Sequence, residues 1–456
     1  MNQLFKNISA VLLTGCLVSF LGCEKFLDEK TSKKLSVPTT LMDFQALLDD
    51  PLGINYSSPV SGGVSADDYY LTDTKWNDLA FQERRMYTWE KDNLFESGFN
   101  DWINVYNAIY VYNTALLGTD KIPRTTANAV EWDNIKGQAL YCRGTSYLEG
   151  VIIWGLAYDD ATAEIDLGMP LRLNTDFNEH SERASIRQTY ELIIQDLKAS
   201  VSLLPIISLS KFRPSKPAAY GLLARAYLSM RDYENAGKYA DSCLSLRNDI
   251  LDYNTISFTG TYPFNIDNNT EIIYFKGMKT LSIISGTMPI VLPKNFESYD
   301  LSDLRKQFFF KKNPDNTYRF RGDYGGDDGP FSGIATNEMF LIKAECLARS
   351  GKVSACMDVL NSLLIKRWNN AKVYVPYSVD NAAEALNVVL KERRKELIMR
   401  ELRWMDIKRL NKEGANIILT RTLNNKIYEL LPNDLKYALP IPEDVIGLSG
   451  MEQNRR

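Results

Sequence analysis

Apolar side chains recur every three or four positions along residues 99–117 and 131–154. These side chains are Trp102, Val105, Ile109 and Tyr112 in the first stretch, and Leu140, Tyr147, Leu148 and Val151 in the second. Such spacing places them on one face of a helix. We therefore predict an amphipathic helix over each stretch, and a shorter helix over residues 41–49, which follow Pro38 and a pair of threonines.

A helical hairpin is predicted over residues 219–244. Small residues recur at the positions where two antiparallel helices would touch, and Asp232 lies in the connecting turn. The small residues are Ala224, Ala236 and Ala240. This spacing is typical of a tetratricopeptide-type hairpin. A fainter copy covers residues 341–364, with Gly351 as the permissive turn residue.

The segment between these hairpins, residues 248–333, has a different pattern. Short β-branched and aromatic runs such as residues 271–275 are separated by clusters of Asn, Asp, Gly and Pro. That pattern predicts an irregular, loop-rich insertion with short β segments. Within it, residues 318–331 combine glycines with aromatic and acidic side chains, so we interpret them as a binding loop.

Composition and charge exclude several classes of function. Of the 456 residues, 45% are hydrophobic and 24% are charged, which is typical of a folded globular protein. A net charge of -4 gives no overall attraction for nucleic acid. His180 is the single histidine, so HExxH zinc sites and 2-His-1-carboxylate iron sites are excluded, and we predict no cofactor. We expect His180 to be a solvated loop residue.

The first residues predict export. Residues 8–22 form an apolar run that is shorter than the about 20 residues of a membrane-spanning helix, as in a secretory signal peptide. Cys16 and Cys23 both follow small residues, as at a bacterial lipobox. We favour Cys23, because cleavage at Cys16 would leave an apolar mature terminus. The predicted signal peptide is residues 1–22, and acyl chains on Cys23 would anchor the protein firmly. A soluble secreted protein with unmodified Cys23 is the alternative.

The other four cysteines, Cys142, Cys243, Cys346 and Cys356, each lie in a helical apolar pattern. A chain of this size does not depend on disulfides. We predict buried free thiols.

Acidic and basic residues alternate at helical spacing over residues 392–409. This arrangement favours ion pairs over a nucleic-acid stripe. We expect four apolar residues of this region to face the core: Leu397, Trp404, Ile407 and Leu410.

The lipobox-like Cys23, the helical hairpin and the charged stretch over residues 392–409 together resemble the SusD/RagB family of outer-membrane nutrient-binding lipoproteins. Residues 23–29 are similar to its lipid cysteine and acidic lead, and residues 216–239 to its tetratricopeptide helices. The most specific matches are residues 331–345, 391–397 and 403–410. The family's closing Pro-Ile-Pro and Gln-Asn also match, at 440–442 and 453–454, whereas Arg455 and Arg456 depart from the usual ending.

The resemblance implies a mainly α fold, an α superhelix of four tetratricopeptide-like hairpins with the loop-rich insertion. It implies one body over residues 23–456, with hairpins at about 99–245 and 335–412 and a ligand region at about 248–333. It also implies a lipid-anchored, surface-exposed outer-membrane protein that captures oligosaccharides for a SusC-like TonB-dependent transporter, without catalysis.

Other functions stay open from the sequence alone. A RagB-like member would capture peptides instead of glycans. The repeats could serve as a protein-binding scaffold. A glycoside hydrolase needs two suitably spaced carboxylates, and no pair stands out among the many acids.

Sugar binding uses aromatic faces together with polar hydrogen-bonding groups. Trp102, Trp132, Trp154 and Trp404 lie in helical apolar patterns, so we expect them in the core. Loop aromatics are better candidates, and they form two clusters. The first is Tyr69, Tyr70 and Trp76, and the second is Tyr318, Arg319, Tyr324 and Phe331.

Four acids in and beside the glycine-rich stretch have side chains that can ligate calcium: Asp315, Asp323, Asp327 and Asp328. They lack the order of ligands found in an EF-hand loop. We expect them to be solvated turn residues and predict no metal site.

Overall fold

The computed structural model describes residues 37–98, 100–278, 281–327 and 329–456. The predictions for residues 1–22 and Cys23 lie outside the described residues. The chain divides into two units, Met1–Thr40 and Leu41–Arg456, and every element below belongs to the second. Among the described residues, no helix has both the length and the apolar character needed to cross a membrane.

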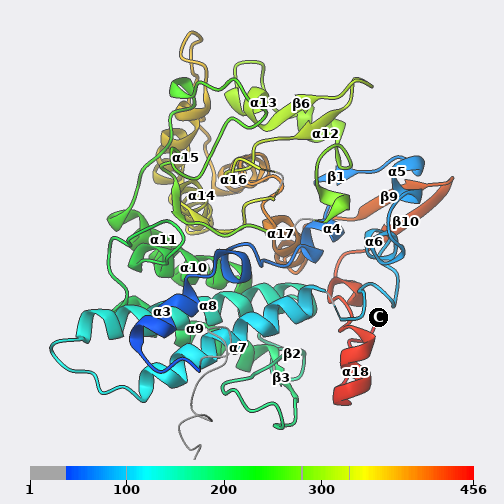
Figure 1. Ribbon diagram of the computed structural model, residues 1–456. Coiled ribbons are helices and arrows are strands. Elements are labelled where there is room, and N and C mark those ends of the chain that lie inside the picture. The colour runs from blue at the N-terminus through cyan, green and yellow to red at the C-terminus, as the bar shows by residue number, and fades with distance from the viewer. Residues whose placement is uncertain (1–36, 99, 279–280, 328) are drawn as a thin grey trace, which may run out of the picture. The chain divides into compact units, whose positions relative to one another are not determined.

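Antiparallel helices form the first half of this unit (Figure 1). Each packs on the next along the chain, from α7 through α11, and the predicted early helix is α3. Their bounds are α3 Leu41–Leu48, α7 Asp101–Asp120, α8 Ala129–Trp154, α9 Ile186–Leu203, α10 Lys216–Met230 and α11 Tyr233–Leu246. The helices predicted over residues 99–117 and 131–154 are thus confirmed.

Small buried residues and a capped turn form the hairpin of α10 and α11, as the sequence predicts. Ala224, Ala236 and Ala240 are fully buried, which lets the two helices approach closely. Arg231 adopts a left-handed conformation at the end of α10, with φ of 65°. Asp232 then caps α11, because its side chain accepts a hydrogen bond from the backbone N–H of Asn235 at 3.1 Å.

The second group of helices continues the stack, since α11 packs on α14 and α14 on both α15 and α16. The bounds are α14 Thr336–Arg349, α15 Val353–Leu364, α16 Ala382–Glu396 and α17 Leu402–Asn411. Gly351 has a φ of 75° in the turn between α14 and α15, as its predicted role requires.

The charged segment near residues 392–409 forms two helices, α16 and α17, separated at Met399 and Glu401, which both have positive φ. Its ion pairs are confirmed: Arg393 Nε lies 2.8 Å from Asp406, and Arg409 lies 2.6 Å from Glu345. The four apolar residues predicted to face the core are buried: Leu397, Trp404, Ile407 and Leu410.

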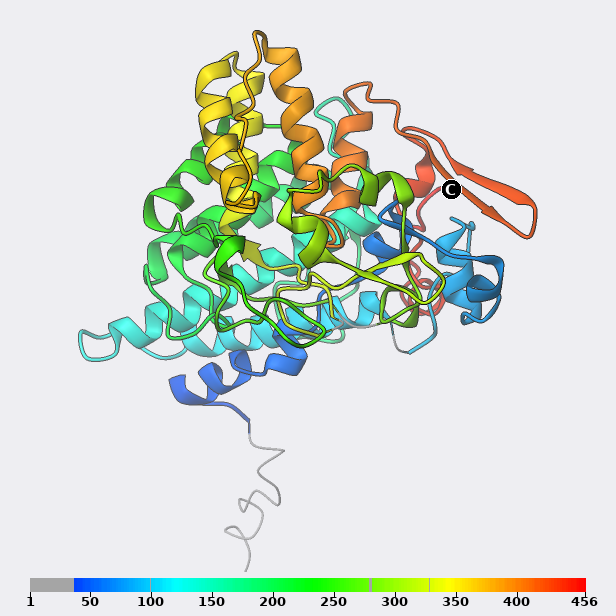
Figure 2. The same ribbon diagram turned by 90° about the horizontal axis from the view of Figure 1, so that it is seen from above.

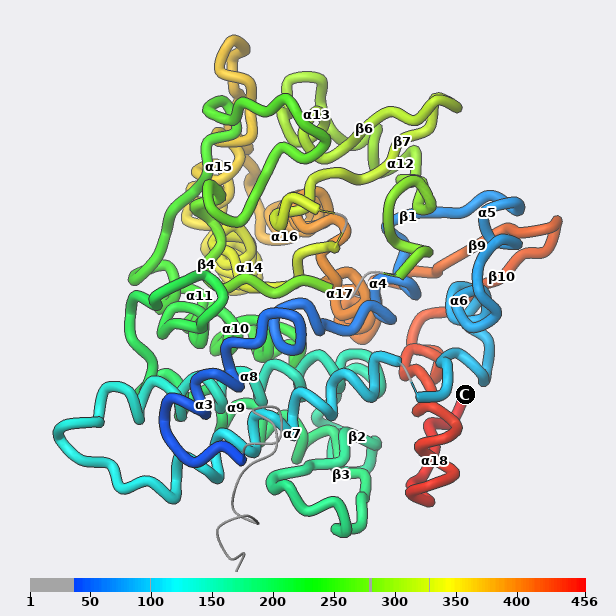
Figure 3. Tube along the Cα trace, in the orientation of Figure 1, coloured from blue at the N-terminus to red at the C-terminus, as the bar shows by residue number. Residues whose placement is uncertain are grey.

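Residues 247–335 form the loop-rich insertion, in which every sheet has two strands. Strand β4 pairs with β8, β6 with β7, and β5 with the distant β1. The trace in Figure 3 shows most of the insertion above α7–α10 and reaching β1. Its elements are η3 Tyr253–Thr255, β4 Ile272–Tyr274, η4 Ser282–Ile284, β5 Ile290–Val291, α12 Pro293–Glu297, α13 Leu304–Phe309, β6 Phe310–Lys312, β7 Tyr318–Phe320 and β8 Ile334–Ala335. The mainly α fold with a loop-rich insertion is thus confirmed.

The remaining elements lie around these two groups. The hairpin of β9 and β10, which sequence reasoning missed, follows α17 and extends beside α5 (Figure 2), where the backbone N–H of Asn424 donates to Asp73 at 2.8 Å. The bounds are η2 Pro51–Asn55, α4 Ser61–Ser65, β1 Tyr69–Tyr70, α5 Asp73–Asn77, α6 Phe81–Tyr87, β2 Leu167–Pro170, β3 Arg183–Ser185, η5 Ile365–Arg367, β9 Leu419–Leu423, β10 Lys426–Leu430, η6 Leu435–Tyr437 and α18 Glu443–Ser449.

The core contains most of the side chains assigned to it. Trp102, Trp154 and Trp404 are buried, and Trp132 is half-buried. The free thiols of Cys142, Cys243, Cys346 and Cys356 are also buried, as predicted. His180 is exposed in the loop between β2 and β3.

Candidate functional site

The two aromatic clusters come from distant parts of the chain, and the structure brings parts of them together. Tyr70 in β1 pairs with Ile290 in β5. Lys75 in α5 donates hydrogen bonds to the backbone oxygens of Thr287 and Met288. The charges of Asp315 and Arg319 act on Lys75, although its burial is the main cause that lowers its pKa. Strand β1 thus pairs with β5, and β5 in turn contacts β7 of the β6–β7 hairpin.

An aromatic stack stands at this junction. The rings of Phe296 in α12 and Tyr318 in β7 are nearly parallel, with centroids 3.7 Å apart and planes inclined by 16°. Lys306 Nζ lies 4.7 Å from the centroid of the Phe296 ring. Arg319 is held beside Tyr318 by a 2.8 Å hydrogen bond to Asn313 Oδ1. We call Tyr70, Trp76, Phe296, Tyr318 and Arg319 the aromatic face.

The side chains of the aromatic face are partly exposed. Trp76 is fixed by a hydrogen bond from its Nε1 to the backbone oxygen of Arg84 at 3.4 Å, and the Arg84 guanidinium lies over its ring. Rings held in this way offer apolar planes, and the neighbouring cations and amides offer donors and acceptors. Such a surface can bind the C–H faces and hydroxyls of a sugar.

Sequence reasoning missed Phe296. It lies in a short helix that begins at Pro293, between polar neighbours. The local signal for an exposed ring is an aromatic residue in a polar stretch that begins with proline. This signal alone does not distinguish Phe296 from the chain's other 18 phenylalanines.

Three other predicted ligand residues lie in the core. Tyr69 and Tyr324 are each 2% exposed, and Phe331 is 1% exposed. Tyr69 packs against Tyr87, and Tyr324 packs against Phe331 with centroids 5.3 Å apart. A ligand at the surface would not reach them, so we interpret them as packing residues.

Buried carboxylates explain why these loops turn inward. Asp323 accepts hydrogen bonds from the backbone N–H groups of Gly325 at 2.5 Å and Phe331 at 2.6 Å. This pulls the glycine-rich loop onto the core. The Gly62–Gly63 segment forms α4 instead of an open loop, and Gly63 N–H donates to Glu401 Oε2 at 2.8 Å. Side chains at either glycine would collide with that carboxylate.

The turn acids divide into two kinds. Asp315 and Asp327 are exposed, as expected, and Asp328 lies outside the described residues. The expectation is wrong for Asp323, which is buried, and this burial together with the nearby Asp327 raises its pKa to about 8. Among the described residues, no group of three or more His, Cys, Asp or Glu side chains is placed to hold a metal ion.

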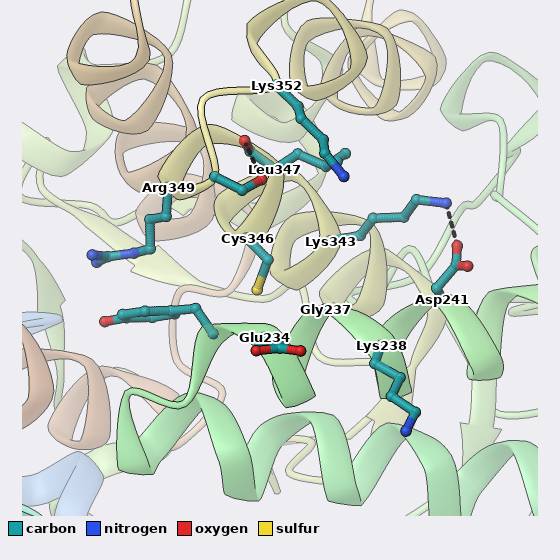
Figure 4. Close-up of a pocket in the computed structure, with 11 residues that line it drawn as sticks. Glu234, Gly237, Lys238, Asp241, Lys343, Cys346, Leu347, Arg349 and Lys352 are labelled. Atoms are coloured by element: carbon teal, nitrogen blue, oxygen red, sulfur yellow. Dashed lines mark hydrogen bonds and ion pairs between the residues drawn. The ribbon is translucent and has the colours of Figure 1, made fainter.

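A groove of about 660 Å³ lies between α11 and α14 (Figure 4). Lys343 and Asp241 form an ion pair across it, and Cys346 lies in its wall. The Arg349 guanidinium lies 3.8 Å from the centroid of the Tyr233 ring. Gly237 lets the helices approach, because a Cβ atom there would lie 2.9 Å from Cys346 Cβ. The groove is therefore a product of repeat packing, with several of its charges already paired.

Two family models match the chain. The one described as "Starch-binding associating with outer membrane" matches residues 25–228. The one described as "SusD family" matches residues 305–454. The chain belongs to the SusD family. This family consists of nutrient-binding proteins.

Individual relatives agree with this assignment. The SusD-like protein P2 of Formosa agariphila is 24% identical over 436 residues, covering 79% of this chain and 80% of that protein. A putative sugar binding protein from Bacteroides vulgatus has a similar structure, with a TM-score of 0.74 at 21% identity, covering 92% of this chain and 99% of that one. A SusD superfamily protein from Bacteroides thetaiotaomicron has a TM-score of 0.71 at 21% identity, covering 91% of this chain and 100% of that one. These two solved structures share the fold of this chain.

Proposed function

We propose that this protein captures a glycan on the aromatic face. The observation that carries the proposal is the stack of Phe296 on Tyr318, with Arg319 hydrogen-bonded beside it. A sugar ring can lie on the stacked rings, and Arg319, which projects from the other side of β7, can donate to hydroxyls that extend past the strand. The solved neighbour described as a putative sugar binding protein supports the same ligand class.

The ligand residues in this proposal are Tyr70, Trp76, Tyr318 and Arg319 from the sequence, with Phe296 added. Tyr69, Tyr324 and Phe331 are not included, because they are buried. Capture without catalysis is the expected mode, since the family is one of binding proteins.

We further propose that Cys23 carries a lipid anchor and that the protein lies at the outer surface of the outer membrane. The description of the first matching family, which associates with the outer membrane, supports this location. A SusC-like TonB-dependent transporter would then receive the glycan. Copurification of such a transporter with the lipidated protein, and its loss in a Cys23→Ala variant expressed in the same cells, would support both parts.

The test of capture is calorimetric titration of residues 24–456 with plant and microbial polysaccharides, their oligomers and a peptide pool. Product analysis of each mixture should accompany it. We expect saturable binding of a glycan with no shortening of its chain. Binding of peptides alone would favour the RagB-like alternative, and release of shorter sugars would contradict the proposal.

A further inference from the structure

A cleft of about 520 Å³ lies away from the aromatic face. Its walls are α7, the loop of residues 171–182 that joins β2 to β3, and α18, all of which lie in the lower part of Figure 1. Helix α7 contributes Trp102, Tyr106 and Tyr110 at intervals of four residues, so all three lie along one side of the helix. The loop contributes a fourth ring, that of Phe177.

Phe177 is 80% exposed, yet it is held in place. Its ring stacks on that of Tyr110, itself 39% exposed, with centroids 4.9 Å apart and planes inclined by 26°. The stack leaves the second face of Phe177 open. Burial of a phenylalanine side chain is favourable, so an open ring face of this size is available to a ligand.

The loop that presents Phe177 is fixed from within. The Arg172 guanidinium donates to the backbone oxygens of Asp176 and Glu179, the latter at 2.6 Å. Asn113, which is fully buried, donates to the backbone oxygens of Arg172 at 2.9 Å and Asn174 at 3.2 Å. Asn113 is itself fixed, because its Oδ1 accepts a hydrogen bond from Arg143 at 2.9 Å. The exposed ring is thus supported by a buried polar network.

The charges in the cleft favour a neutral ligand. Arg172 is the only cation among the described residues that line it. Both of its terminal nitrogens donate to loop oxygens, and Glu179 lies 3.7 Å away. Asp176 adds a negative charge to the lining. An anionic ligand would therefore find no unpaired cation.

Neutral polar groups complete the lining. Asn107, Thr175 and the Tyr110 hydroxyl lie among the rings, and none of these side-chain polar groups is hydrogen-bonded within the described part of the chain. They match the hydroxyls of a sugar. A peptide that binds by strand addition would need a free strand edge, which this cleft does not offer, because its long wall is α7, a helix whose backbone groups are used internally.

We propose that this cleft is a second carbohydrate-binding site, which takes a neutral sugar residue on the open face of Phe177. The choice of ligand class rests on the proposed function. A second site would let one long glycan chain, or two, bind to the same protein molecule and so raise its apparent affinity.

The test uses residues 24–456 in a background that carries Tyr318→Ala and Trp76→Ala, so that the cleft is measured alone. The probes are maltohexaose, cellohexaose, xylohexaose and mannohexaose, titrated calorimetrically. In that background we expect weak saturable binding of a sugar that the unaltered protein binds. Adding Phe177→Ala should weaken it about tenfold, the equivalent of one ring contact. Leu173→Ala, an exposed apolar residue of the same loop outside the cleft lining, should leave it unchanged.

The outcomes separate this inference from the proposed function. If the unaltered protein binds a sugar but Phe177→Ala changes neither affinity nor stoichiometry in either background, the second site is refuted and glycan capture stands. If no form of the protein binds any glycan, the proposed function fails and the sugar assignment of the cleft fails with it. Binding of a peptide pool that depends on Phe177 would also overturn the assignment.

Discussion

Lys408 Nζ donates a hydrogen bond to the backbone oxygen of Gly155 at 2.6 Å, inside the core. A second bond of 2.6 Å reaches the backbone oxygen of Ile152. Helix α8 ends at Trp154, so both acceptors lie at its C-terminus, where carbonyl groups lack helical partners. Burial lowers the pKa of Lys408 to about 7.

This pKa predicts a pH dependence of stability. An unfolded lysine has a pKa of about 10.4, so between about pH 7 and 10 the folded protein binds fewer protons at this site than the unfolded chain. The free energy of unfolding should therefore rise with pH over that window, by at most about 1.4 kcal/mol per pH unit from this group. Urea unfolding of wild type and Lys408→Met across the window measures it. The slope should be smaller in Lys408→Met and unchanged in Lys391→Met, an exposed lysine of α16; equal slopes in all three would contradict the argument.

A second prediction concerns the buried ion pairs of the repeat helices. Glu345 is fully buried and accepts hydrogen bonds from Arg409 at 2.6 and 2.8 Å. Glu345→Gln removes one of the two carboxylates paired with that guanidinium, which keeps its ion pair with Asp406, and should lower the free energy of unfolding by about 1.5–3 kcal/mol. Asp241→Asn breaks the exposed pair with Lys343 and should cost less than about 1 kcal/mol. Chemical denaturation of both variants is the measurement, and similar losses would refute the distinction.

A third prediction concerns the thiols. Burial raises the pKa of Cys346 to about 12, yet this residue lines the groove between α11 and α14. Cys142, Cys243 and Cys356 do not line it. Alkylation of residues 24–456 at increasing urea concentrations, read by mass spectrometry, should modify Cys346 first and the other three only on global unfolding. Earlier modification of another cysteine, or a disulfide in the native protein, would disagree with the structure.

The helices could be predicted because their apolar spacing is sustained over many residues, as in α7 and α8. The turn of the α10–α11 hairpin could also be predicted, because Asp232 caps α11 through a hydrogen bond to a residue only three positions away. The β9–β10 hairpin also had a local signal, since apolar and polar residues alternate on both sides of Asn424 and Asn425, which both adopt positive φ. This hairpin was therefore predictable from its sequence, although we did not predict it.

The aromatic clusters were predictable only as loop residues. Whether a loop ring faces solvent or core depends on distant groups that local sequence does not reveal. Tyr324 points inward because its hydroxyl donates a 3.0 Å hydrogen bond to Glu271, which is far away in the chain. Tyr318 remains partly exposed because Phe296 supports it from another element.

The most direct test of glycan capture is the affinity of residues 24–456 for the best glycan of the panel, compared between wild type and Tyr318→Ala. The variant removes one ring of the Phe296 stack, and Tyr377→Ala, an exposed tyrosine outside the aromatic face, serves as its control. We predict that Tyr318→Ala weakens binding about tenfold or more while the protein stays folded, and that the control binds like wild type. Equal affinity of all three proteins would contradict the claim that the aromatic face holds the glycan.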